Sequence, residues 1–211
     1  DEAGGFLTWT GFIWSRAGQN EIDKGQYHHH ELIFAGKSAS CMIRRDVFHL
    51  TGGFDEDFGI LGEETDLAWR VWLVGFEVHY VPCSVAYHAF NTKFKPAKEF
   101  YTSKRVHYNG CKNYITMLIK NLGKEHLWVV PFHVGCWLIA GLAMLLSLKL
   151  GSGINIFKGL AQAMKSLPTT FSKRKKIQES RKINESDLWP FIYRKAPRGY
   201  YSQRFFRYLR I

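Results

Sequence analysis

A long apolar run divides the chain into a part before it and a part after it. Residues Leu127 to Leu148, LWVVPFHVGCWLIAGLAMLLSL, contain no Lys, Arg, Asp or Glu over 22 positions. A helix of this length would measure about 33 Å, close to the thickness of a bilayer's hydrocarbon core. Lys124 and Lys149 lie just outside the two ends, as interfacial anchors do. We therefore predict a transmembrane or membrane-embedded helix at 127–148. A buried core helix is the alternative, which Pro131 and His133 favour.

Before this run, short β-rich stretches alternate with a helical one. SASCMIRRDVF predicts a strand at about Ala39–Ile43, which the following charges end. GEETDLAWRVWLVG predicts a helix over about 64–73, with Gly75 as its stop. FEVHYVP alternates and predicts a strand at Glu77–Val81 before the proline. This order of elements predicts an α/β domain before the apolar run.

After the run, the chain is strongly basic and contains one amphipathic stretch. Residues 149–211 carry 15 Lys or Arg against 3 Asp or Glu, whereas residues 1–126 carry 14 against 15. The net charge of +11 therefore belongs to the end of the chain. Apolar residues recur at three- and four-residue spacing over Ile154–Leu167, which predicts a helix that Pro168 stops. We predict that 149–211 is a basic amphipathic tail on an anionic membrane surface.

The charges around the apolar run do not decide how it would lie in a membrane. Three lysines occur within about twenty residues on each side, so the positive-inside rule gives a tie. The KRKK cluster at Lys173–Lys176 favours the cytoplasm, and a re-entrant segment, a partner span and partial embedding all stay open. The end of the chain, YRKAPRGYYSQRFFRYLRI, has a composition that also suits stacking on nucleic-acid bases. Next to an apolar run we favour lipid headgroups, and we expect no nucleic-acid partner.

Cysteines and the first residue give weaker indications. Cys41, Cys83, Cys111 and Cys136 are scattered without a C-x-x-C pair, so we predict neither a disulfide framework nor a zinc site. The sequence begins with aspartate rather than methionine, from which we expect a part of a longer protein. The run at His28–His30 is interpreted as a chance run in a loop.

A group of carboxylates at the start of the predicted helix is the first candidate for chemistry. Glu63, Glu64 and Asp66 lie near the positive end of the helix dipole, where acids stabilise a helix. Asp66 also stands four residues before Arg70, the spacing of an ion pair on one helix face. Two adjacent glutamates disfavour the ionisation of at least one of them. A carboxylate with raised proton affinity suits a general base, so a structural and a catalytic interpretation both stay open for Asp66.

Several motifs occur in a characteristic order between Ala35 and His88. The order is MIRRDVF, GGFDE, GEETDLAWR, a Gly-Phe pair, a strand, Val-Pro and Tyr-His. This arrangement closely resembles the C-terminal half of a family 2 glycosyltransferase catalytic domain, and CKNYITMLIKN (Cys111–Asn121) continues the resemblance more weakly. It implies a partial GT-A domain of Rossmann-like α/β fold over residues 1–121. The transmembrane-type helix and the basic helical tail would follow this domain.

The resemblance implies a membrane-associated inverting transferase. Such an enzyme moves a sugar from a nucleotide-diphosphate sugar to an acceptor hydroxyl in the synthesis of a cell-surface or lipid-linked glycan. In the family the general base is the second acid of a Glu-Asp pair at the helix start. This position falls on Glu64, with Glu63 beside it and Asp66 as the fallback. The usual Asp is Glu here, so the carboxylate reaches one methylene further.

The resemblance also implies roles for residues outside the carboxylate pair. Gly53, Phe54 and Asp55 belong to the GGFDE turn on the acceptor side, and Arg70 is a further candidate for substrate binding. A divalent metal, Mg or Mn, is implied, with His88 as a candidate ligand. The string Asp55–Asp57 spells D-x-D, but the family's metal-binding D-x-D sits in a nucleotide-binding half that we do not find here. We interpret the string as a chance match.

Further expectations concern the type of enzyme and the alternatives to it. No Gln-x-x-Arg-Trp motif follows the acidic block, which favours a non-processive transferase. We expect the catalytic domain on the cytoplasmic face of a membrane, and we expect these 211 residues alone to be inactive. The partners would be a nucleotide-sugar donor, a glycan or lipid-linked acceptor, and anionic lipids. A non-catalytic membrane-binding module and a nucleic-acid binder are the competing hypotheses.

Overall fold

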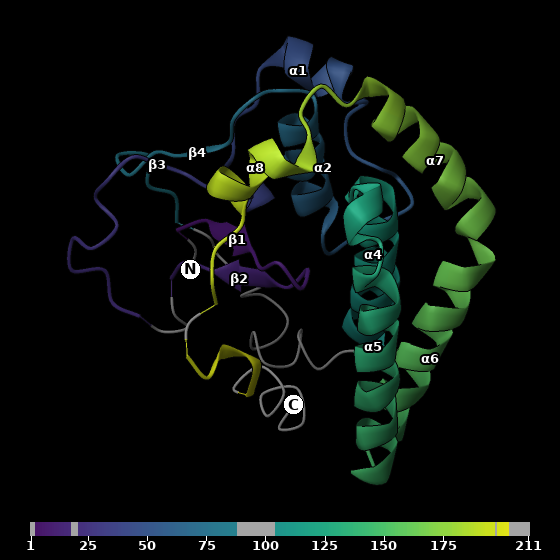
Figure 1. Cartoon of the computed structure of the whole chain (residues 1–211). Helices are drawn as coiled ribbons and strands as arrows, with labels where there is room; N and C mark the ends of the chain where they lie inside the picture. Colours follow the sequence, from purple (N-terminus) through teal and green to yellow (C-terminus); the bar gives the residue numbers. More distant parts are fainter. Residues whose placement is uncertain (1–2, 18–20, 88–103, 197, 203–211) are drawn as a thin grey trace. The chain divides into compact units, whose positions relative to one another are not determined.

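The structure, a computed structural model, describes residues 3–17, 21–87, 104–196 and 198–202 (Figure 1). The chain forms two compact units. Unit 1 contains the described residues of 1–56, 63–88 and 177–195. Unit 2 contains those of 57–62, 89–176 and 196–211. The expected division at residue 149 is therefore not the division that the structure has, because part of the basic segment belongs with the first half of the chain.

Unit 1 contains two small antiparallel pairs of strands. Strand β1 (Gly5–Leu7) pairs with β2 (Ile13–Ser15), with Phe6 opposite Trp14. Strand β3 (Glu31–Leu32) pairs with β4 (His79–Tyr80). The strand expected over 77–81 is thus present but shorter.

The strand expected at Ala39–Ile43 is absent, and that prediction was wrong. Residues Ser38–Ser40 form a short 3-10 helix (η1) instead. The side chain of Met42 is 99% exposed. An apolar run forms a strand only where another strand pairs with it and a core covers it, and here neither condition is met.

The described part of unit 1 contains three complete α-helices, and two buried tryptophans lie on one of them. They are α1 (Arg45–Leu50), α2 (Glu63–Leu73) and α8 (Glu185–Ile192). Trp69 of α2 is fully buried and meets Phe34 edge to face at 5.3 Å. Trp72 Nε1 donates to the carbonyl oxygen of Phe34 at 3.1 Å. Helix α2 ends as expected at Gly75, whose φ of +89° is accessible to glycine without strain.

The segment 177–195 returns to unit 1 through backbone and side-chain contacts. Lys182 N donates to the Leu73 carbonyl at 2.8 Å, just past the end of α2. Arg194 N donates to the Leu7 carbonyl at 2.9 Å, at the end of β1. The Tyr193 hydroxyl, which is buried, donates to Glu185 at 2.9 Å. Together these contacts anchor the segment beside the strands and helices of the first half of the chain.

Unit 2 is built mainly from helices. They are α4 (Lys104–Asn121), the 3-10 helix η2 (Lys124–His126), α5 (Val129–Leu146), α6 (Leu150–Lys165) and the first part of α7 (Leu167–Ser180). Figure 1 shows α4, α5 and α6 side by side. A shared core of buried apolar side chains joins these three helices. Its members are Cys111, Ile115, Ile119, Met144, Ile156, Leu160 and Ala163.

Glycines set the spacing of these helices. A Cβ on Gly159 of α6 would lie 2.6 Å from the Tyr108 carbonyl oxygen and 3.2 Å from Cys111 Cβ, so α6 and α4 touch there. A Cβ on Gly153 of α6 would lie 2.7 Å from the Leu145 side chain of α5, and one on Gly141 of α5 would lie 2.9 Å from Phe157. Gly153 of α6 contacts Leu145 of α5, whereas Phe157, later in α6, contacts Gly141, earlier in α5. The two helices are therefore antiparallel.

The apolar run expected at 127–148 contains α5, and η2 directly precedes it. Within the described residues, Lys124–Leu146 is the one helix with the length and composition to cross a membrane. Its most apolar 18-residue window has a mean hydropathy of 2.0, and 22% of that window is buried. Large apolar side chains stay exposed on it, namely Phe132, Leu138, Ile139, Leu142 and Leu146. By length and composition this helix is weak support for membrane association, which stays a prediction.

Helix α6 uses its apolar face differently from the expectation for 154–167. Leu160 of this stretch is buried in the shared core with Ile156 and Ala163. Phe157 and Leu167 pack against that core, whereas Met164 stays 44% exposed. The chain does not leave the helical conformation at Pro168, because this proline lies in the first turn of α7. A proline there removes an N–H that has no intrahelical partner in any case.

Candidate active site

Helix α2 begins with the two adjacent glutamates. Leu61 and Gly62 precede it with φ of +74° and +88°, a left-handed conformation that turns the chain into the helix. The Glu63 side chain is partly buried, and its Oε2 is buried with no hydrogen-bond partner among the described residues. Burial raises the pKa of the Glu63 carboxyl above its usual value, and the neighbouring charge of Glu64 raises it further. The expectation that adjacent carboxylates oppose each other's ionisation therefore agrees with the shifted pKa of Glu63.

Glu64 has a lysine beside it that the sequence analysis did not predict. Lys37 Nζ lies 3.4 Å from Glu64 Oε1, and the two side chains are 54% and 13% exposed. The lysine reaches the helix start from a position 27 residues earlier in the chain. No local spacing relates such residues, so the sequence carries no signal for this ion pair. Glu64 thus lies mostly buried at the start of α2, with one lysine ammonium group beside its carboxylate.

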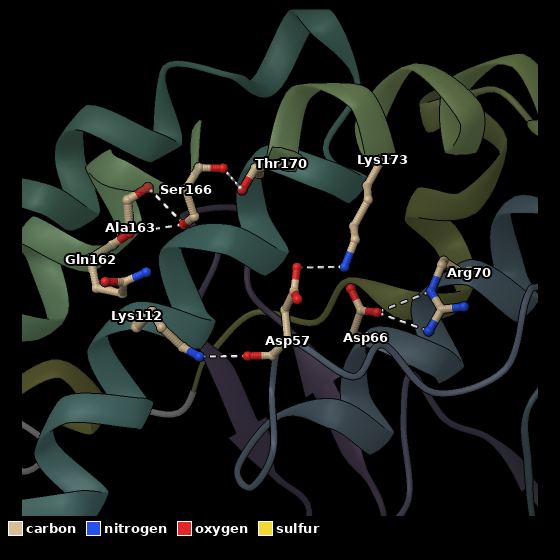
Figure 2. A network of polar contacts seen from close by, with 9 residues as sticks. All are labelled: Asp57, Asp66, Arg70, Lys112, Gln162, Ala163, Ser166, Thr170 and Lys173. Carbon is tan, nitrogen blue, oxygen red and sulfur yellow. Dashed lines mark hydrogen bonds and ion pairs between the residues drawn. The ribbon is translucent and has the colours of Figure 1, made fainter. Parts of the chain in front are cut away.

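Asp66 and Arg70 form the ion pair that their spacing predicts (Figure 2). Arg70 Nε donates to Asp66 Oδ2 at 3.0 Å, and Arg70 Nη2 lies 2.9 Å from the same oxygen. The Asp66 side chain has no exposed surface and that of Arg70 is 7% exposed. Arg70 Nη1 also donates to the Thr51 carbonyl at 2.5 Å. The pair therefore ties α2 to the end of α1, which is a structural role for both residues.

The GGFDE turn follows α1 and is shaped by its glycines. Gly52 and Gly53 have φ of +80° and +69°, and a Cβ on Gly53 would lie 3.0 Å from the Phe48 ring. Phe54 packs edge to face on Phe48 at 5.8 Å and stays 43% exposed. Because Arg70 holds the Thr51 carbonyl just before this turn, the predicted residues Gly53, Phe54, Asp55 and Arg70 belong to one connected part of unit 1.

The D-x-D string is divided between two sets of contacts. Asp55 belongs to unit 1, whereas Asp57 belongs to unit 2 and forms an ion pair with Lys173 of α7 at 2.5 Å (Figure 2). In the part of the chain that the structure describes, no group of three or more His, Cys, Asp or Glu side chains could hold a metal. This applies to the described His28–His30 run as well, whereas the predicted ligand His88 lies outside the described residues.

A second residue that the sequence analysis missed anchors the loop before α2. Asn113 of α4 donates through Nδ2 to the carbonyls of Phe58, Ile60 and Leu61 at 2.8 to 3.0 Å. Asn113 is 2% exposed, so these bonds form away from solvent. They fix the loop 57–62 within unit 2.

Comparison with known proteins places this site in a family. The family model described as "Glycosyltransferase like family 2" matches residues 14–131, more than half of the chain. The chain belongs to this glycosyltransferase family. The resemblance noted in the sequence is thereby confirmed at the level of the family. The matched region includes the GGFDE turn, the carboxylates of α2 and Lys37.

Curated relatives of this family 2 chain are also transferases. It is 39% identical over 61 residues to polypeptide N-acetylgalactosaminyltransferase 3 of Taeniopygia guttata, which covers 28% of the chain and 10% of that protein. It is 38% identical over 61 residues to the Homo sapiens protein of the same name, covering 28% and 9%. It is 30% identical over 79 residues to N-acetylgalactosaminyltransferase 4 of Drosophila melanogaster, covering 37% and 12%. The chain thus spans about a tenth of the length of these relatives. No solved structure matches it.

Proposed function

We propose that this chain is part of an inverting, non-processive glycosyltransferase with Glu64 as its general base. It would move a sugar from a nucleotide-diphosphate donor to a hydroxyl of a glycan or lipid-linked acceptor. Support comes from membership in the family together with the arrangement at the start of α2. There Glu64 keeps part of its side chain exposed beside Lys37, while Asp66 is fully buried in its ion pair.

In the proposed reaction, the acceptor hydroxyl oxygen attacks the anomeric carbon of the donor. The bond from that carbon to the diphosphate oxygen breaks, and the leaving diphosphate keeps the electron pair. The hydroxyl proton moves to the Glu64 carboxylate, which must lie within hydrogen-bond reach. Burial raises the pKa of the Glu63 carboxyl beside Glu64, so this neighbour holds a proton more readily than an ordinary glutamate does.

A divalent cation is implied by the family for the leaving diphosphate, whose developing charge it would offset. The described residues do not supply a set of ligands for it, since no three carboxylate, histidine or cysteine side chains converge there. The steps proposed above therefore use only the residues of this chain.

The substitution Glu64→Gln tests the base directly, in the natural protein that carries this chain. It keeps the side chain's size and removes the proton acceptor. We expect transfer to fall by about 10²–10⁴-fold, while nucleotide-sugar binding measured by calorimetry changes little. Glu77→Gln is the matched control, because Glu77 is an exposed glutamate of the same unit outside the GGFDE turn and its replacement should leave activity unchanged. Normal turnover by Glu64→Gln would disprove the assignment.

Membrane association through the α5–α6 hairpin is the second part of the proposal. The two helices are antiparallel, so the start of α5 and the end of α6 lie at one end of the hairpin. Arg174 donates to the carbonyls of Ile119 and Leu122 at 2.6 Å, which brings the basic cluster 173–176 to the C-terminal end of α4. The cluster and Lys124 therefore lie at the same end, where anionic lipid would attract them.

This arrangement favours a re-entrant hairpin over a helix that crosses the membrane once. The exposed apolar side chains of α5 would enter the lipid, and both ends would return to the same face, for which we propose the cytoplasmic one. Flotation with anionic vesicles tests the association. Protease accessibility of residues before α5 and after α6 tests the topology, because a single crossing would protect only one of the two. A protein that floats but never transfers sugar would favour the alternative, a non-catalytic membrane-binding module.

A further inference from the structure

Unit 2 contains a polar cavity that the proposed reaction does not use. Its volume is about 340 Å³, and it lies between α4, the end of α6 and the beginning of α7. The lining residues are almost all polar or charged, and they include Asp57, Lys112, Asn113, Thr116, Lys165 and Thr170. Figure 2 shows several of the side chains around it. The cavity is partly open to solvent, so a small polar ligand could enter it.

Asn113 supplies a buried acceptor in the cavity wall. Its Nδ2 faces three carbonyl oxygens, those of Phe58, Ile60 and Leu61, so the amide cannot be turned over without placing oxygen against oxygen. Its Oδ1 is consequently directed elsewhere, and it is buried without a hydrogen-bond partner in the described part of the chain. A buried acceptor without a donor is costly, and a ligand hydroxyl would satisfy it.

Hydroxyl groups on α6 and α7 present further acceptors. The Ser166 hydroxyl donates to the Gln162 carbonyl at 2.9 Å, and the Thr170 hydroxyl donates to the Ser166 carbonyl at 2.9 Å (Figure 2). Each hydroxyl hydrogen is thus used within the helix, which leaves the oxygen lone pairs for donors from a ligand. Together with Asn113, this lining suits a molecule that carries several hydroxyl groups.

Positive charge lies around the same cavity. Lys112 Nζ donates to the Asp57 backbone carbonyl at 2.5 Å, which holds this ammonium group at the wall. The Asp57 carboxylate, which is paired with Lys173, is the one carboxylate among the residues that line the cavity, beside the ammonium groups of Lys112 and Lys165. Lys165, the last residue of α6, makes no ion pair with any described carboxylate. The excess of ammonium groups over carboxylates favours an anionic group on the ligand.

We propose that this cavity binds the phosphate ester of a polyol or sugar. The lysines would hold the phosphate, and Asn113 Oδ1 with the hydroxyl oxygens would accept hydrogen bonds from the ligand's hydroxyl groups. Inorganic phosphate alone would leave these acceptors unmatched, and a neutral polyol would leave the lysines unmatched. The ester could be free in solution or could be the headgroup of a lipid. Leu167, just after the cavity's Ser166, packs on the same core as Val130 at the start of α5, at the end of the hairpin where headgroups would lie.

Binding of glycerol 1-phosphate and inositol 1-phosphate, measured by calorimetry, tests the proposal. The matched charge variants are Lys165→Ala, at the cavity, and Lys158→Ala, on the same helix but outside the lining. Thr116→Val removes one hydroxyl at nearly constant size. We expect Lys165→Ala to weaken both esters about tenfold or more, and Thr116→Val to weaken the esters but not inorganic phosphate. Lys158→Ala should bind as the unmodified protein does.

Two further arms identify the source of the ligand and the result that would overturn the proposal. Competition between glycerol 1-phosphate and vesicles containing phosphatidylglycerol would indicate a lipid headgroup, whereas binding of the free esters without vesicle competition would indicate a soluble one. The proposal fails if neither probe binds, or if Lys158→Ala weakens binding as much as Lys165→Ala, since binding would then reflect diffuse charge. Glu64 is not part of the cavity, so these results are independent of the transfer reaction.

Discussion

Removal of the Asp66 carboxylate should destabilise unit 1 rather than simply stop catalysis. Asp66 is fully buried and lies 2.9 Å from Arg70 Nη2. At an effective dielectric constant of about 20, unit charges at that distance attract each other by about 6 kcal/mol, from which the desolvation of both groups subtracts. Loss of one partner leaves an uncompensated charge inside the protein, which typically costs about 3–5 kcal/mol. We expect Asp66→Asn to lower the free energy of unfolding of unit 1 by about this amount.

Hydrogen exchange of the α2 amides measures this cost locally, and the midpoint temperature of the thermal unfolding of unit 1 should fall by roughly 12–40 °C. The double variant Asp66→Leu with Arg70→Met should recover much of the loss, because it removes both charges from the interior. It will not recover all of it, since the Thr51 carbonyl loses the donor that Arg70 supplies. An Asp66→Asn protein with unchanged stability and abolished transfer would refute this reasoning and make Asp66 the base.

Predictions for three other substitutions follow from the same structure. The pKa of Glu63 is raised mainly by burial. Between the usual pKa of a glutamate and this raised pKa, the folded protein binds more protons than the unfolded chain. The free energy of unfolding therefore falls as the pH rises through that window. The melting temperature of Glu63→Gln, taken relative to that of the unmodified protein at the same pH, should therefore be higher at neutral pH than at about pH 4. A relative melting temperature that falls between about pH 4 and neutral pH would contradict the shift. Gly159→Ala should cost about 1–3 kcal/mol in the unfolding of unit 2, because its Cβ would meet the Tyr108 carbonyl. Gly135→Ala in α5, where a Cβ meets nothing within 4 Å, should instead be neutral or stabilise by up to about 1 kcal/mol, and equal effects at both glycines would contradict the packing described for α6.

Features that depend on neighbouring residues in the chain were predicted from the sequence. The region of α2, the Asp66–Arg70 ion pair and the stop at Gly75 all agree with the structure. Helix geometry fixes which side chains meet at a spacing of four, and a glycine can end a helix in the left-handed conformation. The order of GGFDE and GEETDLAWR was also sufficient to indicate the family, which the family model then confirmed.

Features that depend on distant residues were decided by the tertiary structure alone. Lys37 reaches Glu64 across 27 positions, and Asn113 holds a loop more than fifty positions before it. The strand expected at Ala39–Ile43 failed because nothing pairs with it, and Leu160 of the α6 stripe predicted for lipid is buried in the core of unit 2. The chemistry of an apolar or charged side chain determines what kind of partner stabilises it. Which partner it receives depends on which surfaces the folded chain brings together, and no local pattern contains that information.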